Sequence, residues 1–583
     1  MKDMEKKKIK PFYLVPIMIV CLLLFAGIIG FLYKKNTPQP EIAIRNLKVC
    51  HLTNPLGIDE EVPTFSWQMT SGKRGAMQTA YRITVAESKD ALCDEKFLWD
   101  SGKITGSHSV GISYAGESLL SKMRYYWSVT VWDETDTPYT ASEEAWFETG
   151  LMGGGMSDAK WISPASTAPS YTHGNDSRVY EITYNMEVTD TTAGFVFGAK
   201  EGEYGHLYVC SITNKPNEAL FSLHEMQGEY LSTQEADITH IAGGSSHFAV
   251  TLSVDNETLS VTINGTPVGD FSIQSTPVGS IGYYKSRSNS HAYLDNILIT
   301  DETGNTLYQE DFESETTIFA PYYVTTENGK LRIKSGMVLT PGYESPAPLF
   351  RKEFETADKT IQSARLYMTA LGSFSASVNG SAVADDYFSP GKLAYNQQLT
   401  YVTYDITSLL LKGSKNVLGL TLLHGWYDRA VGYPEIYSPW GDTNALKGMI
   451  EICYEDGTYE TIVTDESFLC HTNGPVRSDD IYQGQFYDAN YEQTGFDTVA
   501  YTAGNDWLPA ATNAVDAGYD TLPLTAKENE PIVCIKELTP ISVSEPTEGV
   551  YVYDFGENIV GTVRLHLTGS QGDVITLRYG EEL

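Results

Sequence analysis

The sequence has few of the features by which catalytic and metal sites are most easily recognised. Its seven cysteines are widely separated, none belongs to a C-x-x-C pair, and their spacings match no zinc pattern. It has no G-x-S-x-G elbow and no H-E-x-x-H motif, and no G-K-[ST] accompanies the glycine-rich stretch at 151–158. The motifs therefore give no evidence for a serine hydrolase, a zinc enzyme or a phosphate-binding loop. One or two disulfides are possible, but most of the cysteines are predicted to be buried free thiols.

Basic residues are also scarce. The 40 lysines and arginines are outnumbered by 75 acidic residues, which gives a net charge of −35. Binding to nucleic acid or docking on anionic lipid requires a basic surface, so both are disfavoured. The chain is 42% hydrophobic and 20% charged, a globular composition, and its 583 residues have room for several domains.

Charge is absent altogether from residues 11–33, "PFYLVPIMIVCLLLFAGIIGFLY". A helix of this length crosses the hydrocarbon core of a bilayer. Five lysines precede the run, which predicts a cytoplasmic N-terminus and an extracellular remainder. A cleaved signal peptide would end in an A-x-A-like site, which is lacking, and a lipoprotein would not place Val20 before Cys21. The sequence therefore predicts a single-pass cell-membrane anchor over 1–35 and a polar linker over 36–46.

Long amphipathic helices are lacking as well, and the rest of the chain is predicted to be all-β. Short alternating segments separated by turns recur throughout, and Asn-Gly pairs at 264–265 and 379–380 predict hairpins. In the last block Val563, Leu565 and Leu567 alternate with polar residues, "GSQGD" follows, and a second strand is predicted at 574–577. The fold prediction is several β-sandwich domains in tandem: 47–150, 160–345, 346–525 and the beginning of another at 530–583.

Several of these segments carry family resemblances. "YYWSVTVWD" in the first block resembles the fibronectin type III pattern. "NPLGIDEEVPTFSWQM" (54–69), "LFRKEFE" (349–355), "YVTYDITSLLLKGSKNVLGLTLLHGWYD" (401–428) and the terminal segment 531–583 resemble, in the same order, the front part of bacterial α-L-rhamnosidases, the family 78 glycoside hydrolases. The block 160–345 interrupts that order and resembles concanavalin-like or carbohydrate-binding modules.

The resemblance implies a function and a division of labour. It identifies 346–525 as a jelly-roll-like rhamnosidase N-terminal domain and 530–583 as part of the β-domain before an (α/α) catalytic barrel. The family's catalytic carboxylates lie in that barrel, so no catalytic residue is assigned in this chain. The expected activity is hydrolysis of terminal α-L-rhamnose from glycans or glycosides. The alternative is a non-catalytic cell-surface protein that binds rhamnose-containing carbohydrate.

Two groups of residues are candidate sites. His424, Trp426, Tyr427 and Asp428 in "LLHGWYDR" combine aromatic faces, which stack on sugars, with groups that bind hydroxyls. A packed loop at the edge of the sandwich is the alternative explanation for the same residues.

The second group is a calcium site implied by the resemblance of the interrupting block to sugar-binding modules. Such modules often hold calcium with an acidic residue on the first strand and an Asp on the last, which here are Glu181 and Asp295, with Asn296 as a further oxygen ligand. The alternative is that Asp295 satisfies backbone groups at the end of a strand. No cofactor is otherwise required.

Overall fold

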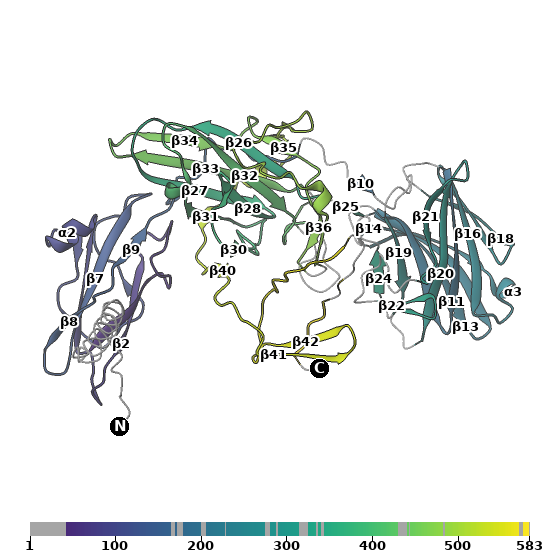
Figure 1. Cartoon of the computed structure of the whole chain (residues 1–583), viewed down its shortest axis with the longest axis horizontal. Coiled ribbons are helices and arrows are strands. Elements are labelled where there is room, and N and C mark those ends of the chain that lie inside the picture. Colours follow the sequence, from purple (N-terminus) through teal and green to yellow (C-terminus); the bar gives the residue numbers. More distant parts are fainter. Residues whose placement is uncertain are drawn as a thin grey trace, which may run out of the picture. The chain divides into compact units, whose positions relative to one another are not determined.

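The computed structural model describes most of the chain after residue 41 (Figure 1). The described residues are 42–583 apart from 165–169, 172–178, 200–205, 228, 274–279, 287–289, 314–323, 334–335, 340–342, 345, 429–439, 442, 482–483, 571–574, 576 and 582–583. The predicted membrane anchor lies outside them. Within these ranges no helix has the length and apolar character needed to span a bilayer.

The regular secondary structure of the described residues is almost entirely β-strand, as predicted. Their α-helices, Lys89–Cys93 (α2) and Thr239–Ala242 (α3), are short, as are the 3-10 turns at Thr407–Leu409 (η2), Ala489–Tyr491 (η3) and Ala517–Thr521 (η4). The chain divides into two compact units, residues 1–152 and 153–583.

The first unit is a small sandwich of two sheets around an aromatic core. Phe65 and Trp127 lie at its centre, fully buried, with ring centroids 4.7 Å apart. One sheet has the order β1 (Ala43–Val49), β2 (Thr64–Thr70), β6 (Ile112–Ser113). The other has the order β4 (Trp99–Asp100), β3 (Ala80–Ala86), β7 (Arg124–Trp132), β8 (Pro138–Thr140), with β5 (Ile104–Thr105) on β3 and β9 (Ala145–Glu148) on β7.

Two larger sheets form the block between residues 179 and 339, named the insert from here on. The eight-stranded sheet has the order β18 (Thr266–Ser272), β17 (Thr258–Ile263), β16 (His247–Asp255), β11 (Val179–Val188), β20 (Ala292–Asp301), β23 (Lys330–Ile333), β22 (Val324–Glu327), with β21 (Thr306–Glu310) on β20. The six-stranded sheet has the order β15 (Glu229–Asp237), β14 (Glu218–Gln227), β13 (His206–Lys215), β12 (Thr191–Ala199), β19 (Ser280–Lys285), β24 (Gly336–Leu339).

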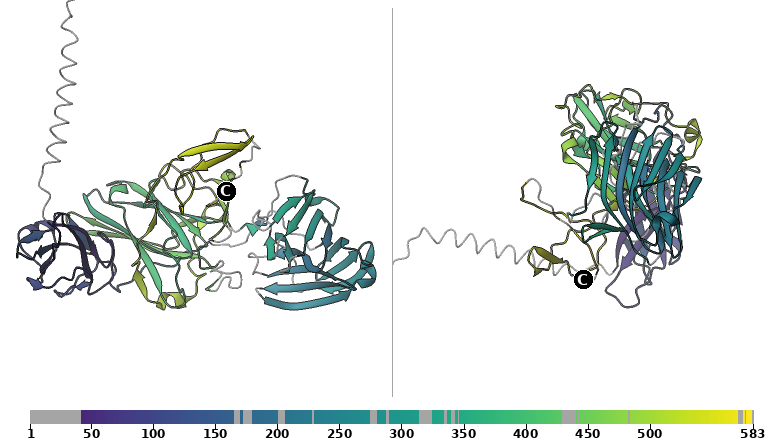
Figure 2. Two further views of the ribbon diagram at one scale, coloured as in Figure 1. Left: turned by 90° about the horizontal axis from the view of Figure 1, so that it is seen from below. Right: turned by 90° about the vertical axis from the view of Figure 1, so that its right-hand side faces the viewer.

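The two sheets of the insert pack face to face on a shared apolar core (Figure 2). Tyr184 of one sheet and Phe195 of the other stack at 4.8 Å. The predicted hairpin turn at Asn264-Gly265 joins β17 to β18, and both residues have positive φ, 50° and 74°. That conformation is the reason for the Asn-Gly preference of two-residue hairpins.

A third pair of sheets forms the sandwich that carries residues 346–526. One sheet has the order β29 (Ser381–Ala382), β28 (Ser373–Val378), β32 (Lys415–Leu423), β26 (Leu349–Glu355), β35 (Leu469–His471), β38 (Leu508–Pro509). The other has the order β34 (Tyr459–Val463), β33 (Ala445–Tyr454), β27 (Ile361–Leu371), β31 (Leu399–Asp405), β39 (Leu524–Ala526). Three two-stranded sheets accompany them: β36 (Val476–Asp480) with β37 (Gly484–Tyr487), β30 (Asp386–Tyr387) with β40 (Ile532–Val533), and β10 (Ser170–Tyr171) with β25 (Tyr343–Glu344).

The chain enters this third sandwich before the insert begins. Ile162 forms a bridge with Leu446, and Ser163 forms one with Ala511. The chain then builds the insert and returns to the same sandwich, where the backbone N–H of Ala347 donates to Val476. The insert therefore interrupts one connection of the third sandwich, which is called the host sandwich from here on.

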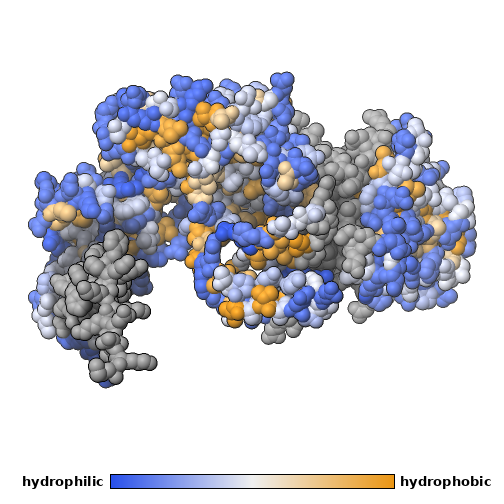
Figure 3. All heavy atoms as spheres, in the orientation of Figure 1, coloured by the Kyte–Doolittle hydropathy of each residue, from blue (hydrophilic) through white to orange (hydrophobic). Residues whose placement is uncertain are grey.

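The terminal segment departs from the prediction. Its described strands form a hairpin of β41 (Ser542–Thr547) and β42 (Val550–Asp554), whereas the predicted strand at 563–568 and the described part of 574–577 are irregular. Ile535 and Val560 are almost completely exposed, and Figure 3 shows apolar side chains on the surface along this hairpin. Alternation alone does not make a strand, because a strand needs a neighbour for its backbone and a layer for its apolar face.

The six cysteines within the described residues are all free thiols. Cys210 and Cys470 are buried, Cys93 and Cys534 are exposed, and Cys50 and Cys453 are half-buried. Burial raises the pKa of Cys210, and it raises the pKa of Cys470 to about 12. The prediction of free thiols therefore holds for these six, but the prediction that most of them are buried is wrong, since only Cys210 and Cys470 are.

This difference predicts selective alkylation at neutral pH. Iodoacetamide should modify Cys93 and Cys534 in the folded protein, and Cys210 and Cys470 only after unfolding in urea, because the thiolate is the reactive form and must be accessible. Peptide mass spectrometry of both samples identifies the modified positions. Modification of Cys210 at the rate of Cys534 in the folded protein would contradict the burial described here.

Candidate functional site

The first predicted site follows strand β32 in the third sandwich. The strand ends at Leu423, and the next five residues turn back against strand β28. Gly425 makes the turn possible: its φ is 59°, and a Cβ atom there would lie 3.0 Å from the side chain of Ser373. The turn brings the side chains of His424 and Asp428 together.

His424 lies between two carboxylates. Its Nδ1 is 2.7 Å from Asp428 Oδ2, and its Nε2 is 4.0 Å from Asp479 Oδ1. Asp479 comes from the β36–β37 hairpin and also accepts the backbone N–H of His424 at 2.9 Å. The amide of Asn444 donates to Asp428 Oδ1 at 3.1 Å and to the carbonyl of Leu371 at 3.2 Å. His424 and Asp428 are buried, so this polar network holds the turn in place.

One atom of the network has no hydrogen bond. Among the described residues, Asp479 Oδ1 is buried without a hydrogen-bond partner, although the edge of the His424 ring lies near it. Buried acceptors normally have partners, so an unmatched carboxylate oxygen is a point at which a hydroxyl could donate. The sequence prediction did not include Asp479, which lies far from His424 along the chain.

The aromatic members of the predicted site point in different directions. Tyr427 is buried, packs against Tyr395 at 5.2 Å, and donates to the hydroxyl of Tyr519 at 3.0 Å. It belongs to the core. Trp426 is half-buried and meets the edge of Phe388 at 5.8 Å, while Phe388 lies 6.4 Å from Tyr387.

Tyr387, Phe388 and Trp426 together form a surface that we name the aromatic patch. Phe388 and Tyr387 are 45% and 49% exposed, so both rings present apolar surface to solvent. Sugar-binding sites use such rings for stacking. The predicted site of four residues thus divides into a buried polar network, a core tyrosine and one member of the aromatic patch.

The predicted calcium residues are not brought together. Glu181 and Asp295 do lie on neighbouring strands, but Glu181 pairs with Thr300 whereas Asp295 pairs with Asn185. Four residues along a strand separate them, which is roughly 13 Å at about 3.3 Å per residue. Asn296 is exposed at the adjacent register shift, with a φ of 52°. In the described ranges no group of three or more His, Cys, Asp or Glu side chains is placed to hold a metal ion.

Asp295 nevertheless lies in an unusual environment. It accepts the backbone N–H of Asn296, and burial raises the pKa of its carboxyl group. Glu181 accepts instead from the hydroxyl of Ser253 at 3.3 Å. The register thus assigns the two carboxylates to separate places on one sheet face.

Models of three known domains match this chain. Residues 44–153 match the "Rha78A-like, N-terminal immunoglobulin domain", and residues 359–536 match the "Alpha-L-rhamnosidase N-terminal domain". Residues 544–583 match the "Bacterial alpha-L-rhamnosidase concanavalin-like domain". The first sandwich, predicted as fibronectin type III-like, is thus matched by an immunoglobulin domain model, and the two share a sandwich architecture.

Comparison of this chain with whole proteins also finds α-L-rhamnosidases. An α-L-rhamnosidase of Streptomyces avermitilis is 30% identical over 581 residues, covering 93% of this chain and 51% of the relative. One from Formosa agariphila is 23% identical and covers 91% of this chain and 39% of the relative. The crystal structure of a Streptomyces avermitilis α-L-rhamnosidase complexed with L-rhamnose has a TM-score of 0.56 at 25% identity, over 89% of this chain and 49% of that one.

The fold alone is shared with a rhamnosidase from Dictyoglumus thermophilum, at 22% identity and a TM-score of 0.51 over 88% of this chain and 39% of that one. The chain thus belongs to the class of proteins that are built from a succession of β-sandwiches. Within that class, the chain is a member of the bacterial α-L-rhamnosidase family, the family 78 glycoside hydrolases, and corresponds to the N-terminal portion of its members. It spans 51% and 39% of the length of the two curated relatives.

The buried network predicts a stability effect of Asp428→Ala. The substitution removes the acceptor of the buried His424 ring and one of the acceptors of the half-buried Asn444 amide, which should cost about 1–3 kcal/mol. The melting transition of this sandwich should fall by roughly 3–10 °C, measured by calorimetry on the whole chain. The control is Glu355→Ala, an exposed carboxylate at the end of β26 that should leave the transition in place. Equal transitions for the two variants would show that the network does not support the turn.

Proposed function

We propose that this chain forms the supporting β-domains of an α-L-rhamnosidase, which removes terminal L-rhamnose from glycans or glycosides. The observation that carries the proposal is the order of the matches: three rhamnosidase domain models follow one another at 44–153, 359–536 and 544–583. The 30% identity to the Streptomyces avermitilis α-L-rhamnosidase extends over 93% of this chain and supports the same function.

The chemistry of glycoside hydrolysis explains why the described domains receive a supporting role. One carboxylic acid protonates the leaving oxygen and a second carboxyl group activates water or attacks the sugar. The family resemblance assigns both groups to an (α/α) barrel, whereas the regular elements of the described residues are almost entirely β-strands. Among the described residues of the third sandwich, the aromatic patch has exposed rings of the kind that line sugar pockets.

We further propose that the protein is held at the cell membrane with its β-domains outside. The support is in the sequence: residues 11–33 carry no charge, and five lysines precede them. An extracellular location would place the domains where rhamnose-containing glycans are encountered.

The proposal predicts that residues 36–583 alone do not cleave p-nitrophenyl α-L-rhamnopyranoside, because the family resemblance assigns the catalytic carboxylates to the barrel and not to these β-domains. The measurement is release of nitrophenol over hours at a protein concentration well above that used for a rhamnosidase. Turnover that disappears when a single carboxylate within 36–583 is substituted would refute the assignment of the catalytic groups to the barrel.

The experiment that tests the proposed function itself is the intact mass of the native protein isolated from its own cells. Because the curated relatives are about twice as long, we expect a mass well above 64.4 kDa. A mass of 64.4 kDa would contradict the proposed hydrolysis and favour the alternative, a surface protein that binds carbohydrate without cleaving it.

A further inference from the structure

Four Asn-Gly pairs occur in this chain, at 264–265, 328–329, 379–380 and 473–474. In such a pair the backbone nitrogen of the glycine can attack the side-chain amide carbon of the asparagine, because glycine has no side chain to hinder the approach. The asparagine then loses its amide group as ammonia. In a folded protein the rate depends on how firmly the fold holds the asparagine side chain and the glycine nitrogen.

Three of the pairs occupy the same kind of turn. The pairs 264–265, 328–329 and 379–380 each form the two-residue loop of a hairpin, namely β17–β18, β22–β23 and β28–β29. In all three the asparagine has a φ of 50–53° and the glycine has a φ of 70–81°. Because the backbone conformation is nearly the same, a difference in reactivity between these pairs has to come from their surroundings.

Asn379 is the most firmly held of the three. Its amide nitrogen donates to the side chain of Asn416 at 2.7 Å, and its side-chain oxygen accepts the backbone N–H of Val417 at 2.9 Å. The backbone N–H of Gly380, which carries the attacking nitrogen, donates to Asp497 at 3.1 Å. These hydrogen bonds engage both the amide and the nitrogen that would attack it, so the pair 379–380 is protected.

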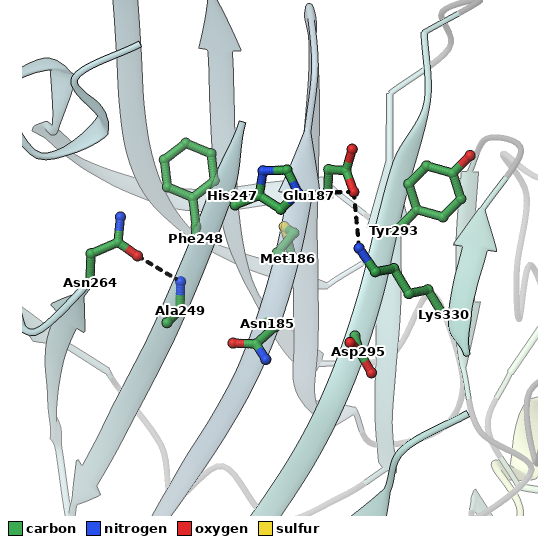
Figure 4. Close-up of a pocket in the computed structure, with 10 residues that line it drawn as sticks. All are labelled: Asn185, Met186, Glu187, His247, Phe248, Ala249, Asn264, Tyr293, Asp295 and Lys330. Carbon is green, nitrogen blue, oxygen red and sulfur yellow. Dashed lines mark hydrogen bonds and ion pairs between the residues drawn. The ribbon is translucent and has the colours of Figure 1, made fainter. Parts of the chain in front are cut away.

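Two other pairs are partly held. The side-chain oxygen of Asn264 accepts the backbone N–H of Ala249 at 2.9 Å, as Figure 4 shows, although Asn264 itself is exposed. The side-chain oxygen of Asn473 accepts from Arg477 at 2.6 Å, and Gly474 is buried. In both pairs a hydrogen bond has to break before the asparagine side chain can turn toward the glycine nitrogen.

The pair 328–329 lacks such contacts. Asn328 is exposed, and its side chain makes no hydrogen bond to any described residue. It lies at the tip of the β22–β23 hairpin, and β22 is the last described strand of its sheet. Strands at the edge of a sheet open more readily than strands inside it. An unrestrained side chain and an edge position therefore both favour reaction at Asn328.

We propose that Asn328 is the preferred site of deamidation in this protein. The backbone nitrogen of Gly329 gives its proton to hydroxide and attacks the side-chain carbon of Asn328, and ammonia leaves as a cyclic succinimide forms. Water then opens the ring at either of its carbonyl carbons and leaves aspartate or isoaspartate. In sum, one amide and one water become a carboxylate and an ammonium ion. This modification goes beyond the proposed hydrolysis of rhamnosides and takes place in the insert.

The product alters the edge of the insert. Isoaspartate continues the chain through its side-chain carbon, which adds one backbone atom to the turn. The turn fixes the register of a hairpin, so the pairing of Glu327 with Lys330 is lost. The new carboxylate also lies beside Glu327 and close to Glu313, whose carboxylate faces Gly329. We therefore expect β22 to separate from β23 as the protein ages.

The test is incubation of the full chain at mildly alkaline pH, followed by digestion with chymotrypsin and mass spectrometry. The sequence places Asn328 in the chymotryptic peptide 324–331 and Asn379 in the peptide 375–387. We expect the deamidated form of 324–331 to appear roughly tenfold or more faster than that of 375–387, because the hydrogen bonds of Asn379 have to open first. Labelling by an isoaspartate methyltransferase distinguishes isoaspartate from aspartate in the product.

Two controls separate the fold from the local sequence. In the same chain unfolded in guanidinium chloride the contacts are gone, and the two peptides should react at similar rates. The variant Asn328→Gln should abolish the signal of 324–331 and leave that of 260–271, which contains Asn264, unchanged. Gly329→Ala is less suitable, because a Cβ atom there would lie 2.6 Å from Glu313 Oε1.

Three results would overturn the proposal. The first is an equal rate at Asn328 and Asn379 in the folded protein. The second is no reaction at Asn328 in the folded protein when the unfolded chain reacts there. The third is an unchanged ratio of the two rates after unfolding, which would assign the preference to the neighbouring sequence. None of these results bears on the rhamnosidase proposal, which the intact mass tests separately.

Discussion

The described part of this protein depends on one property of the β-strand, which sends successive side chains to opposite faces of its sheet. In strand β11 the even-numbered residues Tyr184 and Met186 are buried in the core of the insert. The odd-numbered residues Asn185 and Glu187 lie on the opposite face of the sheet. The same alternation therefore builds the apolar core and displays a polar surface. A shift of one residue in pairing would exchange the two sets, so stability and surface chemistry are set together.

The need of each strand for neighbours explains where the fold is complete and where it is not. In the third sandwich, segments distant in sequence supply pairing partners: β35 and β38 extend the sheet beside β26, and β39 extends the other sheet beside β31. Among the described residues, β41 and β42 pair only with each other, and their residues are largely exposed. Exposed apolar strands of this kind are surfaces to which further strands can add.

Sequence reasoning succeeded for features that are local. The Asn-Gly pairs at 264–265 and 379–380 both have the positive φ values that hairpin turns require. It failed where distant segments decide the outcome. Asp479 completes the network around His424 from another hairpin, and the register of β11 with β20 separates Glu181 from Asp295. The irregular segment at 563–568 shows the same limit, because its alternation was correct but pairing was lacking.

The bridges at Ile162 and Ser163, together with the hydrogen bond from Ala347 to Val476, have a consequence for how such a protein can change. The host sandwich forms backbone contacts with the chain on both sides of the insert. The fold of the host sandwich therefore depends on the residues that flank the insert and not on the insert itself. Connections secured in this way tolerate the acquisition, loss or replacement of whole modules. A module with a different surface can therefore take the place of the insert while the third sandwich stays as it is.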